Sequence, residues 1–188
     1  MSDLEFFSNF PVSIKLVGLG GQGVVTAAAI LARAAFQQGL WSQSMPFFGV
    51  ERTGTPVEAY IKIGRQPIRD RQKIDQPDIL LINDVKLFNR KQLGKFLTIV
   101  NQPEQQIVNQ RIGYDSRQVS LDILGKDLAI GLLGGLAAVW PQISQEAWLR
   151  ALKEHFTNQV LFEINTQAFQ ANFSLVEKLT KYQNGQAR

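Results

Sequence analysis

The sequence has 188 residues, of which 45% are hydrophobic and 19% charged, the composition of an ordinary globular protein of about one domain. It contains no cysteine, which excludes a disulfide framework, a catalytic thiol, a thiolate zinc site and a thiolate-held iron–sulfur cluster within the chain. The formal net charge is +4. A loose basic group at Arg65, Arg69, Arg71 and Lys73 is either a solvated face or a surface that attracts phosphate-bearing partners.

The sequence predicts a cytoplasmic protein. Residues 1–11 carry Asp3 and Glu5 and no basic residue, so they do not resemble a signal peptide. The longest apolar stretch, residues 128–140, is shorter than the ~20 residues that span a bilayer, and it contains glycines. We expect neither a membrane nor a nucleic acid as a partner.

The first part of the chain alternates between strand and helix patterns. Residues 14–17 form an apolar strand that runs into a glycine-rich turn, and residues 24–38 continue with apolar side chains at helical spacing until Gly39 ends the helix. Strand, glycine turn and helix are the opening of a βαβ unit. The next expected elements are a short strand at 41–45, a loop at 46–56, and a strand at 57–63 whose alternation indicates one solvated or interface face.

The second part of the chain predicts a buried sheet followed by helices. Residues 78–82 are a continuous apolar run, typical of a strand buried on both faces of a parallel sheet. Residues 128–140 are almost entirely apolar and predict a buried central helix. The other expected elements are a helix at 84–96, a strand at 97–100, a polar stretch at 101–120 with a short strand at 107–108, a helix at 145–156 capped by Ser144, an amphipathic helix at 162–173 and a frayed polar tail at 181–188.

Together these elements predict one α/β domain over residues 1–188, with its core at about 14–173. Strands alternate with helices through the first hundred residues, whereas the last third predicts helices. We therefore expect a Rossmann-like, mainly parallel sheet with helices on both faces and a helical C-terminal third.

The glycine turn satisfies the G-x-G-x-x-G pattern at Gly18, Gly20 and Gly23. In dinucleotide-binding proteins such a turn brings the backbone and a helix N-terminus close to a phosphate, and an acidic residue about 20 positions later holds the ribose. This sequence has no Asp or Glu between Glu5 and Glu51. The turn therefore either packs a helix closely on a strand or faces a different ligand or a partner chain, and a dinucleotide is disfavoured.

Two stretches resemble the signatures of one family. Residues 18–28 read GLGGQGVVTAA and residues 45–57 read MPFFGVERTGTPV. Together they are similar to the gamma subunit, or gamma domain, of the 2-oxoacid:ferredoxin oxidoreductases, most of all to pyruvate:ferredoxin oxidoreductase (pyruvate synthase). The resemblance runs from about residue 14 to about residue 173. Thr53 departs from the pattern, because the family commonly has a second basic residue there.

The resemblance implies a subunit of a larger enzyme. That enzyme would convert a 2-oxo acid, with pyruvate favoured, and coenzyme A to acyl-CoA and carbon dioxide, with electrons passing to ferredoxin. Thiamine diphosphate, Mg²⁺ and iron–sulfur clusters would lie on partner subunits, in agreement with the absence of cysteine here. This chain would bind no cofactor alone, would carry no catalytic residue, and would be inactive in isolation.

The resemblance points to two loops that face the substrate, coenzyme A or a partner subunit. Gln22 would bond a ligand or a partner backbone there, or else cap the following helix; Phe47 and Phe48 would anchor their loop or form a partner-facing patch; Glu51 and Arg52 would be a surface pair or would contact an interface or a phosphate. The expected site residues are Gly20, Gly21, Gln22, Gly23, Phe47, Gly49, Glu51, Arg52 and Gly54.

No metal site is expected, because Asp115, Asp122 and Asp127 have no His or Glu at ligand spacing. His155, near a helix end, is not expected to be catalytic. Two other functions remain open: a freestanding Rossmann-like nucleotide-binding module, and a non-catalytic interaction protein.

Overall fold

The computed structural model describes residues 10–47, 54–88, 97–108 and 110–186, with side chains described as far as Tyr182. Most of the expected strands and helices are present. The elements are β1 (Val12–Leu19), α1 (Val24–Gln37), β2 (Trp41–Phe47), β3 (Pro56–Gly64), β4 (Ile79–Ile82), the 3-10 helix η2 (Val85–Leu87), β5 (Leu97–Asn101), β6 (Gln106–Val108), β7 (Arg111–Tyr114), α2 (Ser116–Leu124), α3 (Ile130–Val139), α4 (Gln145–His155) and α5 (Gln159–Gln186).

The described strands form one mixed sheet of order β2-β3-β1-β4-β5-β7-β6. Its centre is parallel, because β1 pairs with β4, β4 with β5, and β5 with β7 in the same direction. Both sides of the sheet end in antiparallel pairs, β2–β3–β1 on one side and β7–β6 on the other. The α/β class with a mostly parallel centre is confirmed. The strand that follows α1 does not lie beside β1, since β3 separates them.

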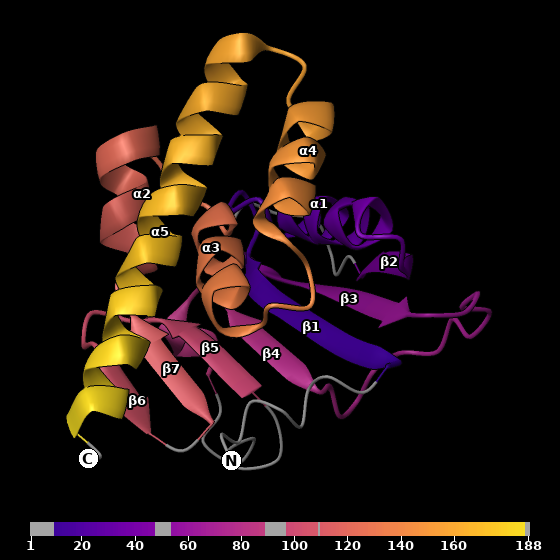
Figure 1. The fold of residues 1–188 in the computed structure, drawn as a ribbon, viewed down its shortest axis with the longest axis horizontal. Helices are drawn as coiled ribbons and strands as arrows, with labels where there is room; N and C mark the ends of the chain where they lie inside the picture. Colours follow the sequence, from indigo (N-terminus) through magenta and orange to yellow (C-terminus); the bar gives the residue numbers. More distant parts are fainter. Residues whose placement is uncertain (1–9, 48–53, 89–96, 109, 187–188) are drawn as a thin grey trace.

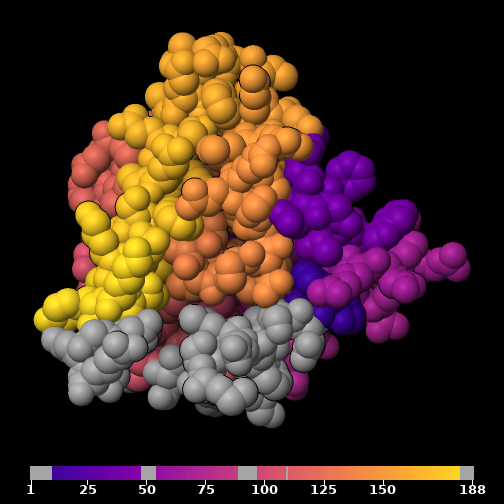
Figure 2. Space-filling model, in the orientation of Figure 1, coloured from indigo at the N-terminus to yellow at the C-terminus, as the bar shows by residue number. Residues whose placement is uncertain are grey.

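The α-helices of the described residues, α1 to α5, lie over one face of this sheet (Figure 1). Strand β1 alternates accordingly, with Val12, Ile14 and Leu16 buried under the helices. In space-filling form, the orange and yellow helices of the C-terminal third make one continuous mass above the sheet (Figure 2). Of the described residues, only η2 brings a helical turn to the other face, where Leu87 and Phe88 pack on a small apolar cluster. Helices on both faces were expected; in the described part of the chain the second face has the short 3-10 turn η2 and no α-helix.

The helix-free side of β1 and β3 carries polar groups. Lys15 pairs with Glu58 at 2.7 Å, and the Tyr60 hydroxyl donates to the same carboxylate. Burial opposes ionisation of Glu58, but the hydrogen bonds from Lys15 and Tyr60 outweigh it and lower the pKa of the carboxyl. This face explains the alternating pattern of residues 57–63.

Three regions differ from the sequence expectations. The expected helix at 84–96 is a 3-10 turn at Val85–Leu87 capped by the Asp84 carboxylate, Phe88 is extended, and residues 89–96 lie outside the described part of the chain. The polar stretch at 101–120 also contains the strand β7, and α2 begins within it after the capping side chain of Asp115. The last helix, α5, is longer than expected, because its apolar face continues through Val176 and Leu179 to the core.

The apolar stretch at 128–140 forms α3, which is buried at the centre of the helix layer as expected. It packs against α5 so closely that Gly134 faces the backbone of Phe169. A β-carbon at position 134 would overlap the Phe169 carbonyl oxygen. Among the described residues, no helix is both long enough and apolar enough to cross a membrane.

We predict that Gly134→Ala lowers the free energy of unfolding by about 1–3 kcal/mol or more, because rigid backbone must move to admit the methyl group. The control is Gly64→Ala, where the nearest atom would lie 3.5 Å from the added β-carbon, an ordinary contact distance. The free energy of unfolding of this variant should differ from that of the wild type by no more than about 1 kcal/mol. Urea unfolding of both variants measures this. Equal effects at the two positions would contradict the packing described for α3.

Candidate functional site

The carboxyl ends of the parallel strands meet at one edge of the sheet, where ligands bind in open α/β proteins. The glycine turn follows β1 at this edge, Asn83 follows β4, Asn101 ends β5, and Asp115 follows β7. The segment before α3 brings Asp127 to the same place, because the backbone N–H of Ala129 donates to the Gln22 carbonyl at 2.8 Å.

The glycine turn has the tight geometry that its sequence predicts. Gly21 and Gly23 have positive φ angles of 92° and 69°, which favour glycine. A β-carbon on Gly18 would lie 2.6 Å from Val24 Cγ2, so a side chain there would push α1 away from β1. Gly23 begins α1 without a side-chain cap, and the first turn of α1 has no acidic residue. The start of α1 is therefore suited to an anion rather than a cation.

Gln22 uses both ends of its side-chain amide within the chain. Its Oε1 accepts from the Leu19 backbone N–H at 2.7 Å, and its Nε2 donates to Asp127 Oδ2 at 2.9 Å. Gln22 does not cap α1, which has no side-chain cap. In this arrangement it holds the turn and ties it to the segment before α3. A contact between Gln22 and a ligand stays a prediction.

A polar cluster surrounds Asp127 at the ends of β4 and β5. The side-chain N–H groups of Asn83 and Asn101 approach Asp127 Oδ1 at 3.3 and 3.4 Å, and Asn101 also donates to the Asn83 carbonyl at 2.9 Å. The backbone N–H of Arg117 donates to Asn101 Oδ1 at 2.9 Å. Asn83 and Asn101 are buried. Four segments distant in the sequence are thus joined by one hydrogen-bond network.

The cluster borders a cavity of about 410 Å³ between the ends of β4, β5 and β7. Burial raises the pKa of the Asp127 carboxyl, and the Asn83 hydrogen bond, the Arg117 charge and the Gln22 hydrogen bond only partly offset that rise. Asn83 Oδ1 is buried and has no hydrogen-bond partner. The cavity is also lined by Asp127, so it offers a carboxylate to a ligand that donates hydrogen bonds.

The two sequence signatures come together in the fold. The Gly20 N–H donates to the Thr55 carbonyl at 2.8 Å, and the Gly54 N–H donates to the Gly20 carbonyl at 3.3 Å. Phe47, at the end of β2, is 55% exposed and so does not anchor its strand in the core. Three expected site residues, Gly49, Glu51 and Arg52, belong to residues 48–53, which lie outside the described part of the chain.

The sequence analysis missed Asn83 and Asn101 and considered Asp127 only as a metal ligand. Each of the two asparagines stands where a buried strand ends, a position that marks ligand-side residues in parallel sheets. That signal was available in the sequence. In the described segments, no group of three or more His, Asp or Glu side chains could hold a metal ion.

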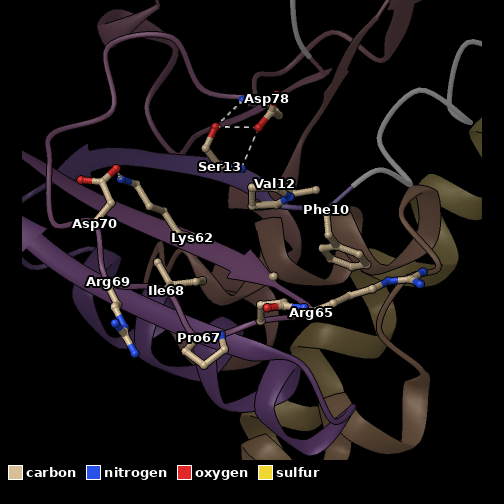
Figure 3. A pocket seen from close by; sticks show the side chains of 13 residues that line it. Phe10, Val12, Ser13, Lys62, Arg65, Pro67, Ile68, Arg69, Asp70 and Asp78 are labelled. Atoms are coloured by element: carbon tan, nitrogen blue, oxygen red, sulfur yellow. Dashed lines mark hydrogen bonds and ion pairs between the residues drawn. The ribbon is translucent and has the colours of Figure 1, made fainter.

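The basic group at residues 65–73 is divided by the structure. Arg65 and Arg69 line a second cavity, of about 820 Å³, at the amino end of β1 (Figure 3). Arg71 and Lys73 do not line it, and the Lys73 ammonium instead lies 5.4 Å from the centre of the Phe47 ring.

Comparisons with known proteins agree on one family. The family described as pyruvate ferredoxin/flavodoxin oxidoreductase matches residues 13–175. The pyruvate synthase subunit PorC of Methanothermobacter thermautotrophicus is 33% identical over 89% of this chain and 97% of its own. The common gamma subunit of the pyruvate/ketoisovalerate oxidoreductases of Thermococcus kodakarensis is also 33% identical, over 87% of this chain and 96% of its own.

Solved structures show the same fold. The pyruvate oxidoreductase subunit PORC of Thermotoga maritima superposes with a TM-score of 0.73 at 22% identity, covering 87% of this chain and 96% of that one. The 2-oxoglutarate:ferredoxin oxidoreductase of Magnetococcus marinus, solved with 2-oxoglutarate, coenzyme A and succinyl-CoA bound, has a TM-score of 0.75 at 16% identity. The match covers 91% of this chain but 32% of that longer chain.

We predict a pH signature for Asp127. Because its pKa is raised in the folded protein, the stability that it contributes is fully present below its ordinary value of 3.8 and is lost as the pH rises through the folded pKa. The difference in unfolding free energy between the wild type and Asp127→Asn should therefore fall as the pH rises from about 4, and then level off. Urea titrations at a series of pH values measure it.

The matched control is Asp122→Asn, which alters an exposed carboxylate on α2. The difference in unfolding free energy between the wild type and Asp122→Asn should not fall in this way as the pH rises. A difference for Asp127→Asn that increases with pH would contradict the burial of this carboxyl.

Proposed function

Because the chain belongs to the pyruvate ferredoxin/flavodoxin oxidoreductase family and matches its gamma subunits over almost its whole length, we propose that it borders the active site of a 2-oxoacid:ferredoxin oxidoreductase. That enzyme, with pyruvate as the expected substrate, forms acyl-CoA and carbon dioxide from a 2-oxo acid and coenzyme A. Electrons pass to ferredoxin through the complex. The chain works only with its partner subunits, in the cytoplasm, and is inactive alone.

One observation carries the assignment of the site. The hydrogen bonds between Gly20 and residues 54–55 join the glycine turn to the end of the 46–56 loop, so these two described segments form a single wall. This wall stands at the carboxyl edge of the parallel strands. Main-chain groups dominate it, and it has no nucleophile or general base among its described members. A wall of this kind positions a ligand, and the reacting groups must come from elsewhere.

The cofactors of the complex belong to the partner subunits in this proposal. A chain without cysteine cannot supply thiolates to an iron–sulfur cluster. The described residues bring together no set of acidic or imidazole ligands for Mg²⁺. These residues therefore do not fit thiamine diphosphate with Mg²⁺ or a cluster, and no step of the reaction is assigned to them.

Coenzyme A is the ligand that we assign to the wall. The glycine turn lets an extended ligand approach the backbone, and the uncapped start of α1 offers N–H groups to a phosphate. Arg52 supplies a planar donor fork that suits a phosphate or carboxylate. Thr53 stands where relatives commonly have a second basic residue. In this proposal, the electrostatic attraction of the coenzyme A phosphate by the second signature therefore depends on Arg52.

A freestanding dinucleotide-binding module fits the structure less well. In such modules the strand after the first helix lies beside β1 and ends in the acid that holds the ribose. Here β3 lies between β1 and β2, and β2 contains no acidic residue. A micromolar affinity of the isolated chain for NADH would favour this alternative nevertheless.

We predict that the isolated chain shows no pyruvate-dependent dye reduction, whereas the complex reconstituted with its partner subunits does. In that complex, Arg52→Ala should raise the KM for coenzyme A by about 10-fold or more, because a charge-assisted hydrogen bond contributes roughly 1.5–3 kcal/mol. The melting temperature of the isolated chain should change by no more than about 2 °C, because a side chain that we assign to a ligand contact contributes little to the folding of the chain alone.

Arg33→Ala is the control, since Arg33 is a half-exposed arginine on α1 and lies outside both signatures. This variant should leave the KM of the complex for coenzyme A within about two-fold of the wild-type value. Dye reduction by the cofactor-free chain alone would overturn the subunit assignment. Unfolding of the free chain by Arg52→Ala, together with normal turnover of the complex that still forms, would show that this loop is structural.

A further inference from the structure

The cavity at the amino end of β1 lies at the opposite end of that strand from the glycine turn. It is formed by the start of β1, the end of β3 and the segment that follows β3, and it has a volume of about 820 Å³. We call it the basic groove. Its walls include Phe10, Val12, Lys62, Arg65, Ile68 and Arg69 (Figure 3).

Both carboxylates of the groove are already satisfied within the chain. Asp78 Oδ2 accepts from the Ser13 backbone N–H at 2.7 Å and from the Ser13 hydroxyl at 2.6 Å. Asp70 pairs with the Lys62 ammonium at 2.6 Å, and Asp70 also accepts from a neighbouring backbone N–H. Asp70 is therefore paired with a cation, whereas Asp78 keeps its negative charge but is held by the neutral Ser13 groups and not by an arginine.

The two arginines of the groove have no carboxylate partner in the described part of the chain. Arg65 extends alongside Phe10, its guanidinium carbon 5.5 Å from the ring centre, and Arg69 extends on the other side of Pro67 (Figure 3). Both side chains belong to exposed residues. The groove thus has two arginines, one on each side of Pro67, that form no ion pair with its two carboxylates.

Between the arginines the surface is apolar. Val12 is buried beneath the groove, Ile68 and Phe10 are half-buried, and Pro67 is exposed on the rim. Small-molecule sites usually enclose most of their ligand, whereas here the rim from Arg65 to Pro67 is open to solvent. An open apolar floor between two cations is better matched by an extended chain segment, with an apolar side chain on the floor and acidic residues on both sides.

We propose that the basic groove receives an extended acidic segment of a partner subunit of the oxidoreductase complex. This inference rests on the proposed function, which requires partner subunits. Charge complementarity selects the occupant: the chain carries a net charge of +4, and the groove presents two guanidinium groups whose planar forks suit carboxylates. The groove adds a docking contact that is separate from the glycine-turn wall, so assembly and coenzyme A binding depend on different residues.

The test compares two double variants that lose the same charge. Arg65→Ala/Arg69→Ala should weaken binding of the chain to its partner subunits at least ten-fold and make that binding less sensitive to salt. Arg71→Ala/Arg150→Ala, with both changes outside the groove, should weaken it less than two-fold. Biolayer interferometry at low and high salt measures both, and unchanged melting temperatures show that each variant is folded.

Because the chain has no cysteine, a single cysteine can carry a photo-crosslinker into the groove. Gln66→Cys should crosslink to an acidic stretch of one partner subunit in the assembled complex, and Gln145→Cys on α4 should not. Equal effects of the two double variants, or a crosslink from position 66 to a stretch without acidic residues, would overturn the proposal.

Other occupants of the basic groove would give different results, and each of those results would also overturn the proposal of an acidic partner segment. Inorganic phosphate that raises the melting temperature of the wild type, but not of Arg65→Ala/Arg69→Ala, with assembly unaffected, would show a small-anion site. Crosslinking of the isolated chain to itself from position 66 would show a second copy. If the wild-type chain fails to bind the partner subunits at all, the proposed function fails; if the wild type and the groove variants bind equally, only the groove assignment fails.

Discussion

The carboxyl edge of the parallel strands depends on one side chain, the amide of Gln22. It accepts a hydrogen bond from the backbone that enters the glycine turn and donates one to Asp127, 105 positions away in the sequence. The first contact fixes the turn and the second joins it to the segment that leads into α3. Through these two contacts, Gln22 links the turn that precedes α1 to the polar cluster at the ends of β4 and β5.

The bridge explains why a turn with a dinucleotide-like pattern need not bind a dinucleotide. The same main-chain geometry that brings a phosphate close also lets β1, α1 and the chain at Gly54 approach one another, and a long amide then secures the arrangement. Asp127 is the costly partner, because its burial disfavours the charged form. Hydrogen bonds from Gln22 and Asn83 offset part of that cost, so the cluster and the turn stabilise each other.

Local patterns predicted β1, β4 and α3 well, because the apolar runs at 14–17, 78–82 and 128–140 are stable only when they are buried. They missed β7 and the full length of α5. They failed where the signal was weak: α2 is short and polar, although Asp115 and Gly125 mark its two ends as a cap and a left-handed stop. The glycine turn could be found from the sequence. The family resemblance also singled out residues 45–57, and residues 54 and 55 of that stretch contact the turn. The positions of Asn83 and Asn101 at strand ends could also be found, but their hydrogen bonds with Asp127 could not, because these form only when segments distant in the sequence lie side by side.

A double-mutant cycle on Gln22 and Asp127 tests the bridge most directly. The free energy of unfolding is measured for the wild type, Gln22→Ala, Asp127→Ala and the double variant at neutral pH. A direct hydrogen bond to a half-buried carboxylate predicts a coupling energy of about 1–2 kcal/mol, so that the double variant loses less than the sum of the single losses. Additive losses, within about 0.3 kcal/mol, would contradict the account and would mean that the glycine turn keeps its shape without Asp127.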